Sequence, residues 1–178
     1  MKSFLNRFSL LRALAAALAI GLLAVGYVSP AAAGALNDYA ENKTLDALFR
    51  GQTLGAPATQ YWGLATDTCS DSTAGTEPSG NAYARVAVTA SLANWAGSQG
   101  TATTVASSGT NGTTSNNVAI TWPASTGAWG TLQSVRLYDA ASGGNSWICI
   151  NLTSSLAVSG TGFTVSFPAA ALTFQIDN

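Results

Sequence analysis

The side chains able to perform acid–base or nucleophilic chemistry are scarce in this chain. Its 178 residues include no histidine, which excludes Ser-His-Asp catalysis, Cys-His catalysis and every imidazole metal ligand. A glycosidase needs two carboxylates about 5 to 9 Å apart in a cleft, and nothing in the spacing of the acidic residues favours such a pair. The carboxylates after residue 51 are Asp67, Asp71, Glu77, Asp139 and Asp177. We therefore predict no catalytic residues, no cofactor and no enzymatic activity.

A metal site has little support in the sequence. Asp67, Asp71 and Glu77 share one loop and could form a weak calcium site, but they lack the spacing of an EF-hand. Solvated loop charges are the interpretation that we favour. The two cysteines are too few and too far apart for a structural zinc site. We predict that the chain binds no metal.

The aromatic residues are more informative. Five tryptophans are present: Trp62, Trp95, Trp122, Trp129 and Trp147. Exposed, they would offer flat faces on which sugar rings stack. Buried, they would serve as core and strand-end packing, which is usual for this residue type. We favour packing and keep the carbohydrate-binding face as the alternative.

The first 33 residues have the pattern of a secretory signal peptide. Basic residues come first, residues 13–28 are an apolar run, and Ala31 and Ala33 precede Gly34 in a signal-peptidase pattern. We expect cleavage after Ala33, so that the membrane is contacted only through the signal peptide before cleavage. The alternative is an uncleaved anchor, for which the run is short.

Export places Cys69 and Cys149 in an oxidising compartment, where a disulfide is the default state. We predict that they pair and close a loop of about 80 residues. Two unpaired thiols are the alternative.

The mature chain would be residues 34–178, enough for one domain. It carries four basic and eight acidic side chains, so it has no basic patch for nucleic acid.

One helix is expected, over residues 34–51. Asp38 and Glu41 have the spacing of a capping box, and Gly51 suits a left-handed cap at the other end. Apolar residues follow at helical spacing, and we expect Leu45, Leu48 and Phe49 to dock the helix on the rest of the domain.

Residues 52–178 have the alternating pattern of β-strands separated by turns. This predicts a mainly β fold, an antiparallel β-sandwich of about seven strands with one wet face per sheet. The expected strands are 60–65, 82–88, 118–122, 132–138, 147–152, 163–167 and 172–176. Residues 96–117 are rich in Ser, Thr and Gly, and read as a flexible loop. We favour a tolerated surface insertion over a recognition loop.

An ordered set of motifs resembles the small tail-fibre or minor-tail proteins of tailed bacteriophages. The motifs are NDYAENKTLDALFRG, APATQYWGLATD, GTEPSGNAYARVAV, AITWPASTGAWGT, VRLYDAASGGN and FTVSFPAAALTF. The resemblance implies a helix followed by a β-sandwich, and a non-catalytic virion protein at the tail tip or fibre base. It also implies a homo-oligomer that assembles with other tail proteins and contributes to host attachment.

Two features depart from this family: the signal peptide and the cysteine pair. Both favour an exported version, periplasmic, extracellular or on the cell surface. The alternative function is therefore an adhesin-like surface module derived from a prophage fibre domain, with cell-surface glycans as candidate ligands.

Overall fold

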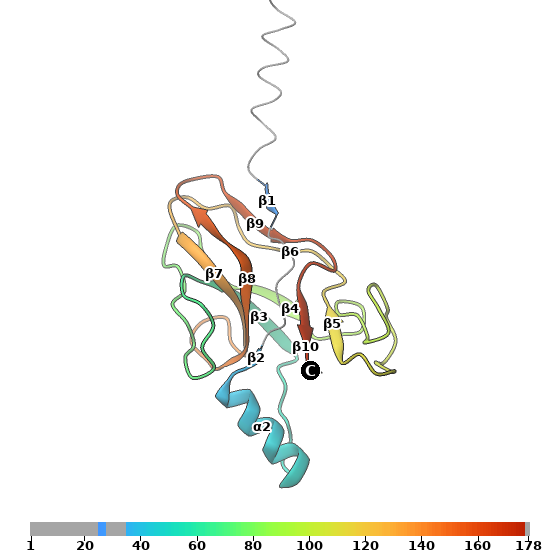
Figure 1. Ribbon diagram of the computed structural model, residues 1–178. Coiled ribbons are helices and arrows are strands. Elements are labelled where there is room, and N and C mark those ends of the chain that lie inside the picture. The colour runs from blue at the N-terminus through green and yellow to red at the C-terminus, as the bar shows by residue number, and fades with distance from the viewer. Residues whose placement is uncertain (1–24, 28–34, 177–178) are drawn as a thin grey trace, which may run out of the picture.

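The computed structural model describes residues 25–27 and 35–176, and it is mainly β with one short helix. The largest sheet has five antiparallel strands in the order β2-β8-β7-β3-β4. Its strands are β2 (Ala35–Leu36), β8 (Ser146–Val158), β7 (Gly130–Tyr138), β3 (Thr59–Ala65) and β4 (Val86–Thr89). Figure 1 shows these strands with the helix below them.

Two small sheets complete the sandwich. One has the order β1-β9-β6, from β1 (Val25–Tyr27), β9 (Thr164–Phe167) and β6 (Ile120–Thr121). The other pairs β10 (Thr173–Gln175) with β5 (Thr113–Ser115). The β1–β9 pairing is parallel, whereas β6 and β9 run antiparallel.

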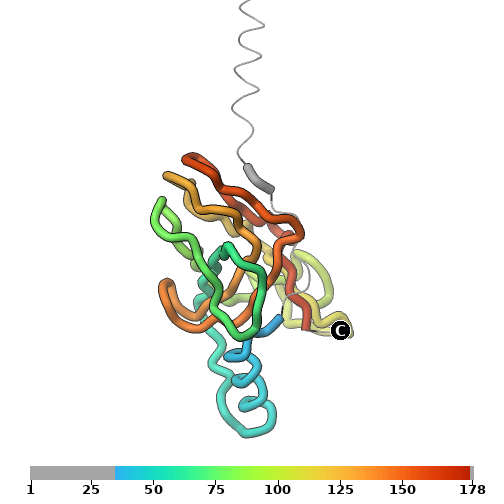
Figure 2. The backbone as a smooth tube through the Cα atoms, turned by 60° about the vertical axis from the view of Figure 1, so that its left-hand side comes forward, coloured from blue at the N-terminus to red at the C-terminus, as the bar shows by residue number. Residues whose placement is uncertain are grey.

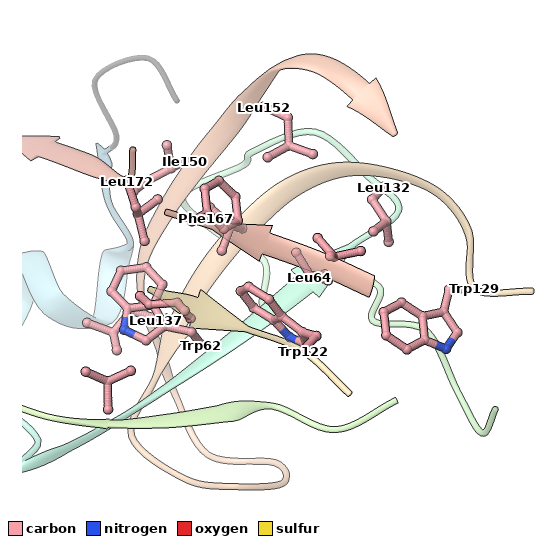
Figure 3. Packing of buried hydrophobic residues seen from close by; sticks show 14 of the residues in the cluster. Trp62, Leu64, Trp122, Trp129, Leu132, Leu137, Ile150, Leu152, Phe167 and Leu172 are labelled. Carbon is pink, nitrogen blue, oxygen red and sulfur yellow. The ribbon is translucent and has the colours of Figure 1, made fainter. Parts of the chain in front are cut away.

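The core lies between the five-stranded sheet and the small sheets. Alternate residues of β3, β7 and β8 point inward, which is why Leu64, Val135 and Ile150 are fully buried. They belong to one cluster with Trp122 and Phe167, whose rings meet edge to face. Figure 3 shows this cluster, with Trp62 at one end and Trp129 at the other. The β-sandwich predicted from the alternation is confirmed.

All seven predicted strands are present, with shifted ends. The second is shorter than expected and begins at Val86. Ala82, the first residue of the predicted strand, has a φ angle of 62°, which lies outside the β region. The predicted loop at 96–117 includes β5, which the sequence did not indicate.

Contrary to expectation, the outer face of the five-stranded sheet is not exposed to solvent along its whole length. Along β7, both the inward and the outward side chains from Ser134 to Tyr138 are buried. The cover is the segment 66–76, which folds back over this face. Its carbonyl groups accept hydrogen bonds from outward side chains of β7: Ser134, Arg136 and Tyr138.

The helix α2 (Asp38–Phe49) follows Asn37, which takes the N-cap position expected for Asp38. Ala40 is buried, and Tyr39 packs edge to face on Trp147 at 5.4 Å between ring centroids. The expected docking through Leu45, Leu48 and Phe49 is wrong, because these side chains are 54%, 71% and 79% exposed. Figures 1 and 2 show the reason: only the start of α2 touches the sandwich, and the rest extends away from it.

The predicted signal peptide and its cleavage site at Ala31, Ala33 and Gly34 lie outside the described residues, apart from residues 25–27. No helix in the described part of the chain combines the length and hydropathy needed to cross a membrane.

Candidate functional site

Two of the three loop carboxylates, Asp67 and Glu77, accept hydrogen bonds from other protein groups. Glu77 accepts hydrogen bonds from the Tyr83 hydroxyl at 2.7 Å and from Arg85. An oxygen of Asp67 accepts from the Thr76 backbone amide at 3.0 Å, and Asp71 is exposed. Among residues 25–27 and 35–176, no three His, Cys, Asp or Glu side chains lie close enough to hold an ion.

Glu77 and Arg85 are the centre of a partly buried polar cluster. The guanidinium of Arg85 lies 3.4 Å from the centroid of the Tyr138 ring and donates to the carbonyl oxygens of Ala140 and Gly143. Burial, reinforced by Glu77, raises the pKa of Tyr138 to about 12, and the same two causes raise the pKa of Tyr83. Neither phenol ionises near neutral pH, and the carboxylate of Glu77 forms an ion pair with the guanidinium of Arg85. The cluster therefore holds neighbouring loops together, because Arg85 binds both Glu77 and the carbonyl groups of residues 140 and 143.

Cys69 and Cys149 form the disulfide predicted from the sequence. Their Cα atoms are 5.6 Å apart, within the range that a bridge requires. Cys149 lies on the outer face of β8, directly opposite Arg136 of β7. The Cys69 backbone amide also donates to Asn151 Oδ1 at 2.8 Å. The segment 66–76 is thus tied to the outer face of both β7 and β8.

The tryptophans mainly pack, as we favoured. Trp62, Trp122, Trp129 and Trp147 are buried, and none of them forms an exposed sugar-stacking face. Trp95 is half-buried and lies against Trp62, with ring centroids 5.3 Å apart.

A cavity of about 280 Å³ opens beside this tryptophan pair. It lies between the five-stranded sheet and the β5–β10 sheet, and its lining includes Gln60, Trp62, Ser91, Trp95, Thr114 and Phe174. Sequence patterns did not predict this cavity, because its lining comes from segments far apart in the chain.

The exposed part of α2 is a second candidate site. Leu45, Leu48 and Phe49 leave the helix uncovered over its last two turns, while Asp46 and Arg50 form an exposed ion pair at 3.0 Å. Leu45, Leu48 and Phe49 are neighbours at helical spacing, and clustered exposed apolar residues make this face a candidate interaction surface. The helical spacing of these residues in the sequence correctly predicted the apolar face. The expectation that the rest of the same domain covers this face was wrong.

Comparison with known proteins identifies the family. No curated protein matched the chain. A family profile described as "Podophage GP4 fiber I protein gp80" matches residues 35–175, which include α2 and every described strand except β1. The resemblance to phage tail-fibre proteins is thereby confirmed. The chain belongs to the podophage GP4 fiber I protein gp80 family.

Proposed function

We propose that the protein is a non-catalytic structural subunit of a phage tail fibre, contributing to tail-tip or fibre assembly and to host attachment. Membership of the fibre family supports association with other virion proteins. The polar cluster at Glu77 and Arg85 is a structural clamp, and no other described group is arranged for acid–base work. The observation that carries the assembly role is the uncovered apolar face of α2.

The proposed partner of that face is a second copy of the chain. A helix of 12 residues is marginally stable in water on its own, and only the start of α2 is held by the sandwich. Its exposed surface combines Leu45, Leu48 and Phe49 with exposed charges of both signs, Glu41 and Arg50. Two copies of such a helix can pair apolar with apolar and acid with base, and homo-oligomers of this kind are common.

Substituting Leu48 and Phe49 by serine should therefore abolish self-association without unfolding the sandwich. Both side chains are more than two thirds exposed in the single chain, so the monomer loses little by their removal. Sedimentation velocity would show an oligomer for the natural protein and a monomer for the variant. Val105→Ser is the matched control, since Val105 is 59% exposed on a different segment. A natural protein that sediments as a monomer at all concentrations would contradict the proposed pairing.

The alternative is an exported, adhesin-like surface module built from a fibre domain. The Cys69–Cys149 disulfide favours it, because such bridges form in oxidising compartments. The fibre role needs the chain to be part of the particle.

We expect the chain to be found in purified phage particles. Particles from a producing culture would be banded by density and probed with an antibody, beside the cell-envelope fraction of the same culture. Detection of the chain at the tail end of the particles by immunogold labelling supports the fibre role. Detection only in the envelope fraction would overturn it and favour the surface module.

A further inference from the structure

The strand β1 (Val25–Tyr27) covers one edge of β9. The two strands are parallel, and their register places Gly26 opposite Val165. Figure 1 shows β1 at the margin of the sandwich, beside β9. Residues 25–27 belong to the segment 1–33, whose removal we predict from the sequence. Cleavage after Ala33 therefore takes this strand away and leaves β9 as the edge of a two-stranded sheet with β6.

The direction of the backbone groups of β9 shows what the loss of β1 leaves behind. The Val165 carbonyl faces β6, because it accepts a hydrogen bond from the Trp122 amide at 3.0 Å. Alternate residues of a strand direct their N–H and C=O groups to opposite edges, so those of Thr164 and Ser166 face β1. The register places Gly26 between them, where its N–H can donate to the Thr164 carbonyl and its carbonyl can accept from the Ser166 amide. Without β1, no other strand of the described residues pairs with these two amides and two carbonyls.

The strand β9 lacks the usual defences of an exposed sheet edge. Natural edge strands are blunted by charged side chains, by proline or by bulges. The strand reads Thr-Val-Ser-Phe, and Pro168 comes only after its last residue. Residues 118–135 and 150–176, which include β6 and β9, contain no charged side chain. Such an edge favours the addition of a further strand, and its neutral surroundings favour an uncharged one.

A second copy of the chain offers no spare strand for this edge. The first and last strands of the described mature chain are β2 and β10, and they already pair with β8 and β5. The family match supports association with other virion proteins instead. The segment that fits is indicated by β1 itself, which is short, uncharged and parallel to β9.

We propose that, after removal of residues 1–33, the β9 edge binds an extended, uncharged segment of another virion protein in place of β1. The main chain of that segment supplies the hydrogen bonds that β1 supplied, and this is the usual basis of strand addition. The inference rests on the proposed place of the chain in a fibre, and it gives that assembly a second contact besides α2. In the full-length chain β1 blocks this contact, so it forms only after cleavage.

The direct test is a titration of the exported protein with a synthetic peptide of residues 24–29. Intact mass first establishes that the exported chain begins at Gly34. In ¹⁵N-labelled protein, the amide resonances of Thr164 and Ser166 should shift and saturate at peptide concentrations on the order of 0.1 to 1 mM. The same peptide with Gly26→Pro lacks the central N–H and should bind about tenfold more weakly, which is about 1.4 kcal/mol. An exported chain that retains β1, the absence of a shift, or equal binding of the two peptides would overturn the proposal.

Variants of the protein locate the binding edge. Thr164→Pro removes an amide that faces β1 and leaves the ladder with β6 intact, because that ladder uses the groups of Val165. It should weaken binding of the peptide at least tenfold without a large change in the unfolding midpoint. Thr164→Val keeps the amide at nearly the same volume, and this matched control should bind as the natural protein does. If both variants bind the peptide equally, the peptide lies elsewhere and the proposal is wrong; if the proline variant does not fold, the proline peptide and the natural protein still decide.

Photo-cross-linking in purified particles identifies the occupant of the edge. Thr164→benzoylphenylalanine should cross-link, on irradiation, to an uncharged segment of a different virion protein, which mass spectrometry of the linked peptides would identify. Ser142, exposed in the turn between β7 and β8, is the control position and should not link to that segment. A link from position 164 only to a second copy of the chain, or no link there, would contradict the assignment. The titration uses the isolated chain, so its failure leaves the detection of the chain in particles unaffected, and absence from particles leaves the titration unaffected.

Discussion

Replacing both Cys69 and Cys149 by serine should lower the free energy of unfolding by about 4 kcal/mol. The bridge joins residues 80 positions apart, and in the chain-entropy model a loop of that length constrains the unfolded state by about this amount. Guanidinium unfolding of the natural protein and the double variant measures the difference. Total stabilities of single domains are about 5 to 15 kcal/mol, so the change should be obvious in the midpoint.

The natural protein treated with a reductant provides the control for this result. It has the same broken link without any substitution, and should be destabilised to the same extent. If the double variant and the reduced protein both unfold within about 1 kcal/mol of the oxidised protein, the bridge adds little to stability. The segment 66–76 would then depend on its hydrogen bonds alone.

The regular part of the fold was predictable from periodicity. Strands such as β7 and β9 alternate apolar and polar residues over a long enough run to be recognised, and the buried positions Val135, Val165 and Phe167 follow that alternation. The strand β2 was missed because its two residues lie within the span expected to be helical, and β5 was missed because Thr113–Ser115 contains no apolar residue that could alternate with the polar ones. Their pairing is determined by the neighbouring strand, not by their own residues.

The cover of the outer face could not be predicted. In the sequence, Arg136 lies between Val135 and Leu137, as an outward, solvated residue of a half-buried strand would. In the structure it is fully buried, because its partners are backbone carbonyls of Thr68 and Thr73. Every residue has a backbone carbonyl, so residue types do not show which carbonyls will accept a hydrogen bond from a buried side chain. The cysteine pairing was predictable because two cysteines in a chain expected to reach an oxidising compartment form a disulfide by default.

The two candidate sites, the exposed face of α2 and the cavity, also differ in how far the sequence could predict them. The spacing of Leu45, Leu48 and Phe49 revealed an apolar stripe, but periodicity does not specify whether the same chain or another chain covers it. The cavity depends on where Gln60, Trp95 and Phe174 meet in space. The family match supports a role in a fibre and names no ligand.

Replacing Arg136 by methionine should lower the free energy of unfolding by about 3 kcal/mol. Hydrogen bonds to charged groups contribute about 1.5 to 3 kcal/mol each, and the guanidinium donates to Thr73 at 2.7 Å and to Thr68 at 3.1 Å. Asp67, at 3.7 Å, adds less because its side chain is 40% exposed. Methionine keeps much of the volume but leaves two carbonyls without donors. Arg50→Met is the control: that arginine is exposed, and its removal should change stability by less than about 0.5 kcal/mol.

Combining Arg136→Met with the two cysteine substitutions tests whether the segment 66–76 acts as one unit. Arg136 and Cys149 are directly opposed across β7 and β8, and both hold this segment against the same face. Once the disulfide is gone, the segment is already partly released, so the loss of Arg136 should cost less than it does in the oxidised protein. We expect the combined variant to be more stable than the sum of the separate effects predicts, by at least about 0.5 kcal/mol, as contacting groups usually are coupled. Strict additivity would contradict this, and would mean that the arginine and the disulfide anchor independent parts of the loop.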